Sequence, residues 1–232
     1  MKPVLTRLDR AGHYGVAYHN FMRWRDDNHT FAALAAVRAR TYHFVSGEGS
    51  GERLDGSEVS PSYFEVLGVE PARGRRFLPA DTVPGSCRVA IVSHALWQRN
   101  FVGDSEVAGA MLRLDGEPHE VVGVMPPASP DRALGWEDLW TPLAVDEAAA
   151  LETPLHGFGV LGRLDPGVTV TEARSDLDAV ARRLEDELPA WNRGWGVEMH
   201  PIRWWITGDV ERPLLLLLWS SVRDCWAGAW SG

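Results

Sequence analysis

Residues 60–77 have the sequence SPSYFEVLGVEPARGRRF, which contains signals for the start and the end of a short helix. The pair Ser60-Pro61 combines a helix-capping residue type with a proline at the first helical position, where its missing N–H needs no partner. Phe64 and Leu67 share one face, and Gly68 can adopt the left-handed conformation that ends a helix. The segment therefore predicts a short helix that packs by its apolar face.

Strand patterns lie on the N-terminal side of this helix. Residues 37–45 (VRARTYHFV) are rich in β-branched and aromatic side chains. Residues 52–59 can return as a second strand after the glycine-rich turn of residues 47–51. Together these segments predict a hairpin with a loose loop.

A second strand-rich region lies on the C-terminal side. Residues 88–92 (RVAIV) predict a short apolar strand, and Ser93 can cap a helix from His94 to Phe101. Leu112–Val124 predicts an antiparallel hairpin, because the turn pair Asp115-Gly116 tolerates the positive φ angles of a type I′ turn. Farther along, Leu139-Trp140 predicts an edge strand.

Helical periodicity occurs near both ends of the chain. The spacing of Phe21, Trp24, Phe31 and Leu34 predicts one amphipathic helix with a break near Asn28. A short polar-faced helix is predicted over Asp146–Leu151, and a strand is predicted over residues 157–164.

The strongest helix signal begins at Thr169. Thr169 and Glu172 form a capping box, and Pro189 ends the apolar stripe that follows. A final strand is predicted over residues 195–203. The apolar stripe of this helix consists of Ala173, Leu177, Val180, Leu184 and Leu188.

Hairpins mixed with helices favour an α+β fold over a regular βαβ repeat.

Composition limits the class of protein. The chain has 232 residues, enough for one large or two modest domains, and 45% of them are hydrophobic, which is typical of a folded protein. The formal net charge of −9 argues against a nucleic-acid partner, because phosphate binding depends on clustered Lys and Arg. Cys87 and Cys225 lie far apart and indicate neither a zinc site nor a disulfide framework.

No catalytic, cofactor-binding or metal-binding residue is predicted. The eight histidines are spread along the chain without the spacing that places metal ligands on one face. Residues 47–51 lack the Gly-Lys-Ser/Thr ending of a phosphate-binding loop. The adjacent pair Ser93-His94 leaves a hydrolase as a remote alternative, although neighbouring helical side chains point roughly 100° apart and Ser93 is better explained as an N-cap.

The C-terminal segment has features of a membrane interface. Leu214–Leu218 is a leucine run, but Arg223 and Asp224 interrupt the apolar stretch at about half the ~20 residues of a spanning helix. Seven of the eleven tryptophans lie in the final 42 residues, as expected where a chain meets lipid headgroups. A tryptophan-rich core edge followed by an accidental tail is the alternative. Residues 1–10 show no export signal.

Four segments resemble the MacB-like periplasmic core domains of ABC-transporter permeases. They are residues 60–77, quoted above, 89–99 (VAIVSHALWQR), 112–127 (LRLDGEPHEVVGVMPP) and 163–169 (RLDPGVT). The resemblance extends from about Tyr18 to Leu218 in the family's order. It is greatest to the orphan-permease branch of FtsX/MacB-type proteins, whose permeases carry no nucleotide-binding domain on the same chain.

The resemblance implies a two-lobed domain inserted between the first two membrane helices of a permease, on the periplasmic side of the inner membrane. A porter-like βαβ lobe next to the membrane would comprise about residues 1–40 and 151–212. An inserted β-rich lobe would comprise about residues 41–150. Residues 213–232 would be the truncated start of a membrane helix.

The same resemblance implies a function without catalysis or a cofactor. The domain would relay conformational change or contact partner proteins during export. Its expected partners are the permease's membrane helices and a separate ATPase subunit, and the full transporter could contain a homodimer. A free-standing periplasmic binding module and a non-functional permease fragment are the open alternatives.

Overall fold

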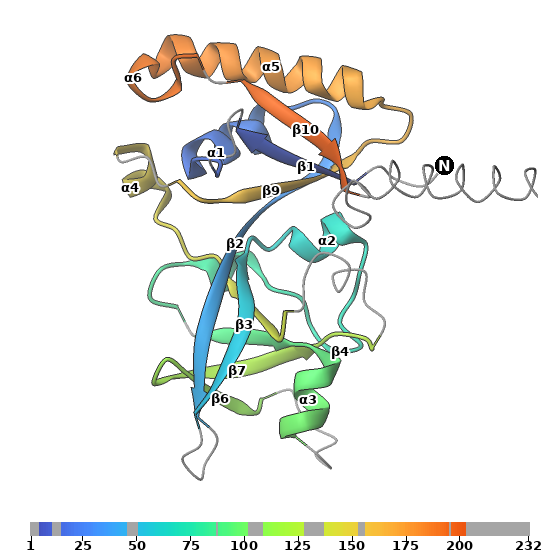
Figure 1. Cartoon of the computed structure of the whole chain (residues 1–232), viewed down its shortest axis with the longest axis vertical. Helices are drawn as coiled ribbons and strands as arrows, with labels where there is room; N and C mark the ends of the chain where they lie inside the picture. The colour runs from blue at the N-terminus through green and yellow to red at the C-terminus, as the bar shows by residue number, and fades with distance from the viewer. Residues whose placement is uncertain are drawn as a thin grey trace, which may run out of the picture.

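The computed structural model describes residues 5–10, 15–45, 51–86, 88–101, 109–127, 137–152, 156–194 and 196–202 (Figure 1). The strands are β1 (Leu5–Arg10), β2 (Phe31–Val45), β3 (Gly51–Val59), β4 (Arg73–Gly74), β5 (Val89–Val92), β6 (Met111–Leu114), β7 (Glu117–Val124), β8 (Leu139–Pro142), β9 (Gly159–Leu164) and β10 (Val197–Pro201). The helices are α1 (Tyr18–Asp27), α2 (Tyr63–Leu67), α3 (His94–Asn100), α4 (Glu147–Glu152), α5 (Val170–Glu187) and α6 (Pro189–Asn192), with a 3-10 turn over Pro79–Thr82.

These elements form two lobes along one path of hydrogen-bonded strands, in the order β10-β1-β9-β2-β3-β8-β5-β7-β4. We call the part containing β1, β9, β10, α1, α4, α5 and α6 the helical lobe. The barrel lobe contains β3 to β8 and α3. Strand β2 runs through both lobes (Figure 1). The mixture of mostly antiparallel strands with helices confirms the predicted α+β class.

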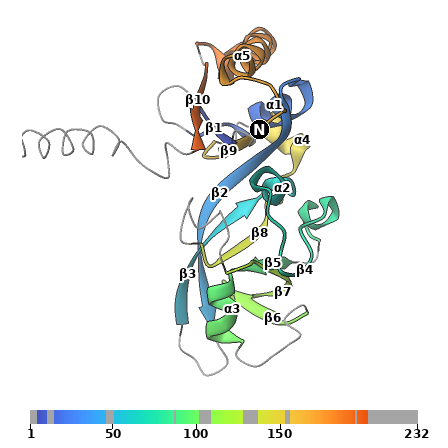
Figure 2. The same cartoon turned by 90° about the vertical axis from the view of Figure 1, so that its right-hand side faces the viewer.

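The core of the helical lobe lies between its helices and its sheet (Figures 1 and 2). The buried stripe of α5 faces apolar side chains of α1, β2, β9 and β10, as the helical periodicity predicts. The capping box is confirmed, since the Thr169 N–H donates to Glu172 Oε2 at 2.8 Å and the Glu172 N–H donates to Thr169 Oγ1 at 3.2 Å. This cluster includes Tyr18, Phe21, Trp24, Leu34, Phe158, Val160, Leu164, Ala173, Leu177, Val180, Leu184, Val197 and Met199.

The barrel lobe closes its strands into a ring. From β2 the pairing runs through β3, β8, β5, β7 and β6, and the bridge between Phe44 and Leu114 returns it to β2. All six strands contribute to one buried cluster, which fills the interior as in other small barrels. That cluster contains Tyr42, Phe44, Leu54, Ala90, Val92, Leu112, Leu114, Val121, Val124 and Leu139.

Strand β2 changes its partner where it passes from one lobe to the other. Residues 31–37 pair with β9, residues 37–45 pair with β3, and Val37 has a partner on both sides. At the next position in register, β3 turns away toward α2, and the Ser60 N–H donates to Ala36 O at 3.0 Å.

Two serine side chains then continue the hydrogen bonding of β2. The Ala36 N–H donates to Ser60 Oγ at 3.1 Å, and Ser62 Oγ donates to Leu34 O at 2.6 Å. From β9, Arg163 Nε donates to Val66 O of α2 at 2.8 Å. Helix α2 is thereby fixed between the lobes, and we call Ser60, Ser62 and Arg163 the waist contacts.

The apolar face of α2 packs against both lobes. Its buried side chains share a cluster with Ala35 and Leu161 of the helical lobe's sheet and with Ile91 and Trp140 on the outside of the barrel. The predicted helix and its glycine C-cap are confirmed, because Gly68 adopts φ 69°. The predicted N-cap is wrong: the helix begins at Tyr63, and the Ser60 hydroxyl bonds to β2 instead.

The predicted N-terminal helix is also shorter than its periodicity suggests. Helix α1 ends at Asp27, and Phe31 and Leu34 belong to β2. Asn28 explains the break, because its Nδ2 donates to Trp24 O at 2.7 Å and its Oδ1 accepts the Phe31 N–H at 3.0 Å. The three- and four-residue spacing of apolar residues that predicted one helix therefore continues by chance into β2.

Two sequence predictions for the barrel lobe have different outcomes. The hairpin of β6 and β7 is confirmed, and Asp115 (φ 51°) and Gly116 (φ 83°) have the positive φ angles of a type I′ turn. The edge-strand prediction for Leu139-Trp140 is wrong, because β8 lies between β3 and β5.

The sequence did not predict strand β1, because its charged sequence LTRLDR has no apolar alternation. Within the described residues, no helix has both the length and the apolar character needed to cross a membrane. The predicted membrane-helix start at residues 213–232, residues 47–50 of the predicted turn 47–51, and Cys87 and Cys225 lie outside the described residues.

The Ser60 contact predicts a specific loss of stability. In Ser60→Ala, the buried Ala36 N–H loses the hydroxyl oxygen that accepts it, and an unsatisfied buried group costs about 1–3 kcal/mol. We expect the free energy of unfolding in urea to fall by about that amount. Thr171→Ala, at an exposed position on α5, is the control and should change it by less than about 0.5 kcal/mol. Equal effects of the two variants would contradict the proposed role of Ser60.

Candidate functional site

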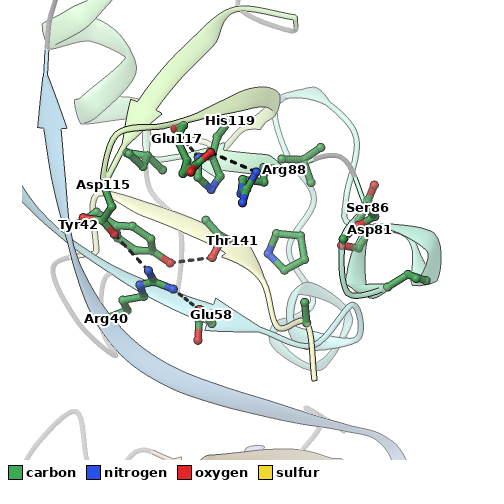
Figure 3. Close-up of a pocket in the computed structure, with 16 residues that line it drawn as sticks. Arg40, Tyr42, Glu58, Asp81, Ser86, Arg88, Asp115, Glu117, His119 and Thr141 are labelled. Atoms are coloured by element: carbon green, nitrogen blue, oxygen red, sulfur yellow. Dashed lines mark hydrogen bonds and ion pairs between the residues drawn. The ribbon is translucent and has the colours of Figure 1, made fainter. Parts of the chain in front are cut away.

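A polar pocket with a cavity volume of about 370 Å³ opens at the mouth of the barrel (Figure 3). It lies next to the bridge between Phe44 and Leu114, where β6 ends in the turn to β7. Its lining combines charged side chains with a few apolar ones, and most of the residues come from β2, β3, β5, β6, β7, β8 and the positions 81–86 and 88. The lining residues are Arg40, Tyr42, Glu58, Asp81, Val83, Gly85, Ser86, Arg88, Val89, Leu114, Asp115, Glu117, His119, Thr141, Pro142 and Ala144.

One wall is a network of ion pairs on β2 and β3. Arg40 Nη1 donates to Glu58 Oε1 at 2.6 Å, and Arg38 Nε donates to Glu58 Oε2 at 2.7 Å. Arg40 Nη2 also donates to Asp115 Oδ2 at 3.2 Å. The carboxylate of Glu58 is buried, as its residue is 7% exposed. Two guanidinium groups therefore hold one buried carboxylate in place, which supplies the compensation that a buried charge requires.

Asp115 closes the barrel beside this wall. Its Oδ1 accepts the His43 N–H at 2.9 Å, and its own N–H donates to His43 O at 2.8 Å. The hydrogen bond from the His43 backbone, together with the nearby Arg40 guanidinium, lowers the pKa of Asp115 below its ordinary value. Asp115 thus has two roles: it starts the hairpin turn and lines the pocket as a stable carboxylate.

The floor of the pocket consists of two buried hydroxyl groups. Tyr42 Oη and Thr141 Oγ1 lie 2.7 Å apart and share a hydrogen bond (Figure 3). Tyr42 is 2% exposed and Thr141 is 6% exposed. Burial raises the pKa of Tyr42 to about 12, because the phenolate would lose its hydration. The floor is therefore a neutral hydrogen-bonding surface at physiological pH.

The opposite wall carries Arg88, Glu117 and His119. Arg88 Nη1 lies 3.3 Å from Glu117 Oε2, and both side chains are more than half exposed. His119 Nδ1 lies 3.0 Å from Glu117 O, so this nitrogen carries the proton and donates to the carbonyl. Burial lowers the pKa of His119, which favours the neutral imidazole.

The pocket has the chemistry of a binding site. The Ser86 hydroxyl donates to the Asp81 carbonyl at 3.2 Å and to no histidine. In the part of the chain that the structure describes, no group of three or more His, Cys, Asp or Glu side chains could hold a metal ion. Paired charges and hydroxyls line the cavity, so its surface can form hydrogen bonds and ion pairs with a polar molecule.

Ser93 and His94 lie outside this pocket. Ser93 Oγ accepts the Leu96 N–H at 3.1 Å, which confirms its predicted role as the N-cap of α3. The His94 ring packs edge-on against Trp97, with ring centroids 5.2 Å apart. The described contacts of Ser93 thus include no base that would activate its hydroxyl as a nucleophile.

Sequence analysis did not find the pocket residues. Arg40 lies between Ala39 and Thr41, Glu58 lies between Ser57 and Val59, and charged residues at such positions are most often ordinary solvent-facing side chains. Of the lining residues, only Asp115 belongs to a recognisable sequence pattern, and that pattern is the hairpin turn. The lining residues converge through the closure of the barrel, which no local pattern indicates.

The buried floor predicts a pH dependence of stability. Tyrosine in the unfolded chain ionises near its ordinary pKa of 10.0, whereas the pKa of Tyr42 in the folded chain is about 12. Between these values the unfolded chain holds fewer protons, so stability falls as pH rises. We expect a loss of about 1 kcal/mol from Tyr42 between about pH 9 and about pH 11, measured by urea unfolding. Tyr42→Phe should lack this part of the loss; an identical decrease in both proteins would show that Tyr42 is not the group responsible.

Three solved structures have the same fold. The periplasmic region of MacB from Actinobacillus actinomycetemcomitans superposes with a TM-score of 0.62 at 12% identity, covering 85% of this chain and 88% of that one. A domain assigned to a permease protein from Porphyromonas gingivalis gives 0.65 at 16% identity, covering 85% and 89%. The extracellular domain of the noncanonic ABC-type transporter YknZ from Gram-positive bacteria gives 0.58 at 15% identity, covering 84% and 99%.

Sequence comparison identifies the family. No curated protein sequence matches this chain significantly. The family model described as the MacB-like periplasmic core domain matches residues 14–180, which include α1, the barrel lobe and most of α5. The chain therefore belongs to the family of MacB-like periplasmic core domains, the extracytoplasmic domains of ABC-transporter permeases.

Proposed function

We propose that this domain relays conformational change between two membrane helices of its permease and catalyses no reaction itself. The observation that carries the proposal is the pairing of β1 with β10. These strands are antiparallel neighbours, and Thr6 pairs with Pro201. The chain consequently enters and leaves the helical lobe at adjacent positions, as insertion between two membrane helices requires.

The path of strands supports transmission as a rigid body. Strand β1 pairs with β9 as well as with β10, β9 pairs with β2, and β2 continues into the barrel. A displacement of the first or the last strand is thus passed to the barrel through backbone hydrogen bonds. The waist contacts add a second connection, because they fix α2 to β2 and β9.

The two lobes would have different positions relative to the membrane. We assign the helical lobe to the membrane-proximal side, expected from the sequence over about residues 1–40 and 151–212, and the barrel lobe to the distal side, expected over about residues 41–150. Tyr18, Val197 and Met199 share one buried cluster, which supports placing both ends of the domain in one lobe. Leu143 and Ala150 pack in the same cluster, so the distal lobe ends near β8 on this assignment.

ATP hydrolysis would belong to a separate subunit on the cytoplasmic side. We expect the 232-residue chain to bind no ATP, since its sequence has no phosphate-binding loop. Isothermal titration of the purified chain with ATP and Mg²⁺ should give no saturable heat up to about 1 mM, a limit that corresponds to about −4 kcal/mol. Saturable binding, or hydrolysis that persists through repurification, would contradict a purely mechanical role.

The relay predicts that flexible junctions uncouple the barrel from the membrane helices. In a complete permease reconstituted with its ATPase subunit, a label at exposed position 111 reports ATP-dependent movement by energy transfer to a lipid-bound dye. Gly-Ser insertions immediately before Leu5 and after Ile202 should abolish this change, because rigid transmission ends at those points. ATP binding by the partner subunit should persist.

The same insertion between Val45 and Gly51 is the matched control, since these ends of β2 and β3 lie at the end of the barrel away from the helical lobe (Figure 1). It should preserve the ATP-dependent change. If the junction insertions leave the movement intact, the relay is wrong. If only the control insertion blocks transport, a partner protein that contacts the distal end explains the function instead.

A further inference from the structure

The charges around the barrel-mouth pocket are balanced. Its four carboxylates each have an arginine partner: Glu58 pairs with Arg38 and Arg40, Asp81 with Arg75, Asp115 with Arg40, and Glu117 with Arg88. With His119 neutral, the lining and its partners carry no net charge. A ligand with a single net charge would be attracted and repelled to a similar extent by these groups. A ligand with separated charges of both signs can place its cation near a carboxylate and its anion near an arginine.

One of these ion pairs is less tightly held than the others. Arg88 and Glu117 approach to 3.3 Å, and their side chains are 56% and 55% exposed. Exposed ion pairs of this kind contribute little to stability. Arg88 and Glu117 can therefore give up their mutual contact and bind charged groups of a ligand at low energetic cost. In contrast, Glu58 accepts hydrogen bonds from two arginines, and Asp115 accepts them from Arg40 and from the His43 backbone.

The floor offers a further hydrogen-bond donor. Tyr42 and Thr141 carry two hydroxyl hydrogens, but the bond between them uses only one. The second hydrogen is available to an acceptor in the pocket that these hydroxyls line.

We propose that the barrel mouth binds a zwitterionic ligand of amino-acid to dipeptide size, with its ammonium group on Glu117 and its carboxylate on Arg88. The cavity of about 370 Å³ falls within the ordinary range for small-molecule sites, about 300–1,000 Å³. The oxygen atoms of the ligand can also accept a hydrogen bond from the floor hydroxyls. This inference goes beyond the relay, because it gives the barrel lobe a ligand of its own.

Three matched probes separate the two charges. Alanyl-alanine carries both charges, alanyl-alanine amide keeps only the ammonium, and N-acetyl-alanyl-alanine keeps only the carboxylate. We titrate each probe into the 232-residue chain and measure affinity by chemical-shift changes of pocket amides. Alanyl-alanine should bind about tenfold more tightly than either capped probe, because each cap removes one charge-assisted contact.

Two variants assign each charge to its partner. Arg88→Met should lower the affinity for alanyl-alanine to that for alanyl-alanine amide, since the carboxylate no longer has its cation. Glu117→Gln should lower it to that for N-acetyl-alanyl-alanine. Arg174→Met, on an exposed α5 arginine that lies 4.0 Å from Asp178, is the matched control and should change nothing. Unchanged melting temperatures show that each variant is folded.

The outcomes distinguish the sources of a ligand. The proposal of a free zwitterionic ligand is supported if alanyl-alanine binds more tightly than both capped probes and each variant lowers its affinity to that of the corresponding capped probe. Equal affinity for N-acetyl-alanyl-alanine and alanyl-alanine overturns the proposal and points to the C-terminus of another protein chain. No binding up to about 10 mM, a free energy weaker than about −3 kcal/mol, also overturns it. None of these results depends on movement of the domain in the transporter, so the relay and the ligand site can fail independently.

Discussion

The structure depends on satisfying the backbone of β2 where that strand changes its partner. A buried N–H or C=O without a hydrogen bond is costly, and β2 loses β3 as a partner at Val37 while still in the interior. The Ser60 and Ser62 hydroxyl groups take over this pairing. One strand can therefore pass through both lobes, and α2 must lie at their junction. The serines at the start of the segment 60–77 are thus explained by β2 rather than by the helix.

Side-chain packing follows from the same arrangement. The three buried clusters correspond to the helical lobe, the barrel interior and the layer around α2. Strand β5 is buried on both faces, since Ala90 and Val92 point into the barrel cluster while Val89 and Ile91 join the layer around α2. Through this double burial the barrel wall forms part of the connection between lobes. The pocket lies at the end of the barrel, next to the bridge between Phe44 and Leu114 where β6 turns into β7.

Local signals in the sequence predicted the elements that depend on neighbouring residues. The turn at Asp115-Gly116 and the capping box at Thr169 are determined within four residues, so both were found. Barrel closure depends on pairing between Phe44 and Leu114, and the ion-pair wall depends on the register that places Arg38 opposite Glu58. Neither pairing has a local pattern. The family resemblance supplied the two-lobed architecture, but it supplied no residue of the pocket.

Closure of the barrel also affects how copies of the domain can associate. Unpaired strand edges are templates for intermolecular β-pairing, and a closed ring removes them. Among the described strands, the path ends only at β10 and at β4, and β4 has two residues. Among the described strands, uncontrolled sheet extension between molecules therefore has two starting points: the outer edge of β10, and the edge of β2 over residues 38–45 that faces β6. In a crowded compartment, the bridge at Phe44 and the hydrogen bonds of Asp115 to His43 cover part of that second edge, so they limit aggregation as well as shaping the pocket.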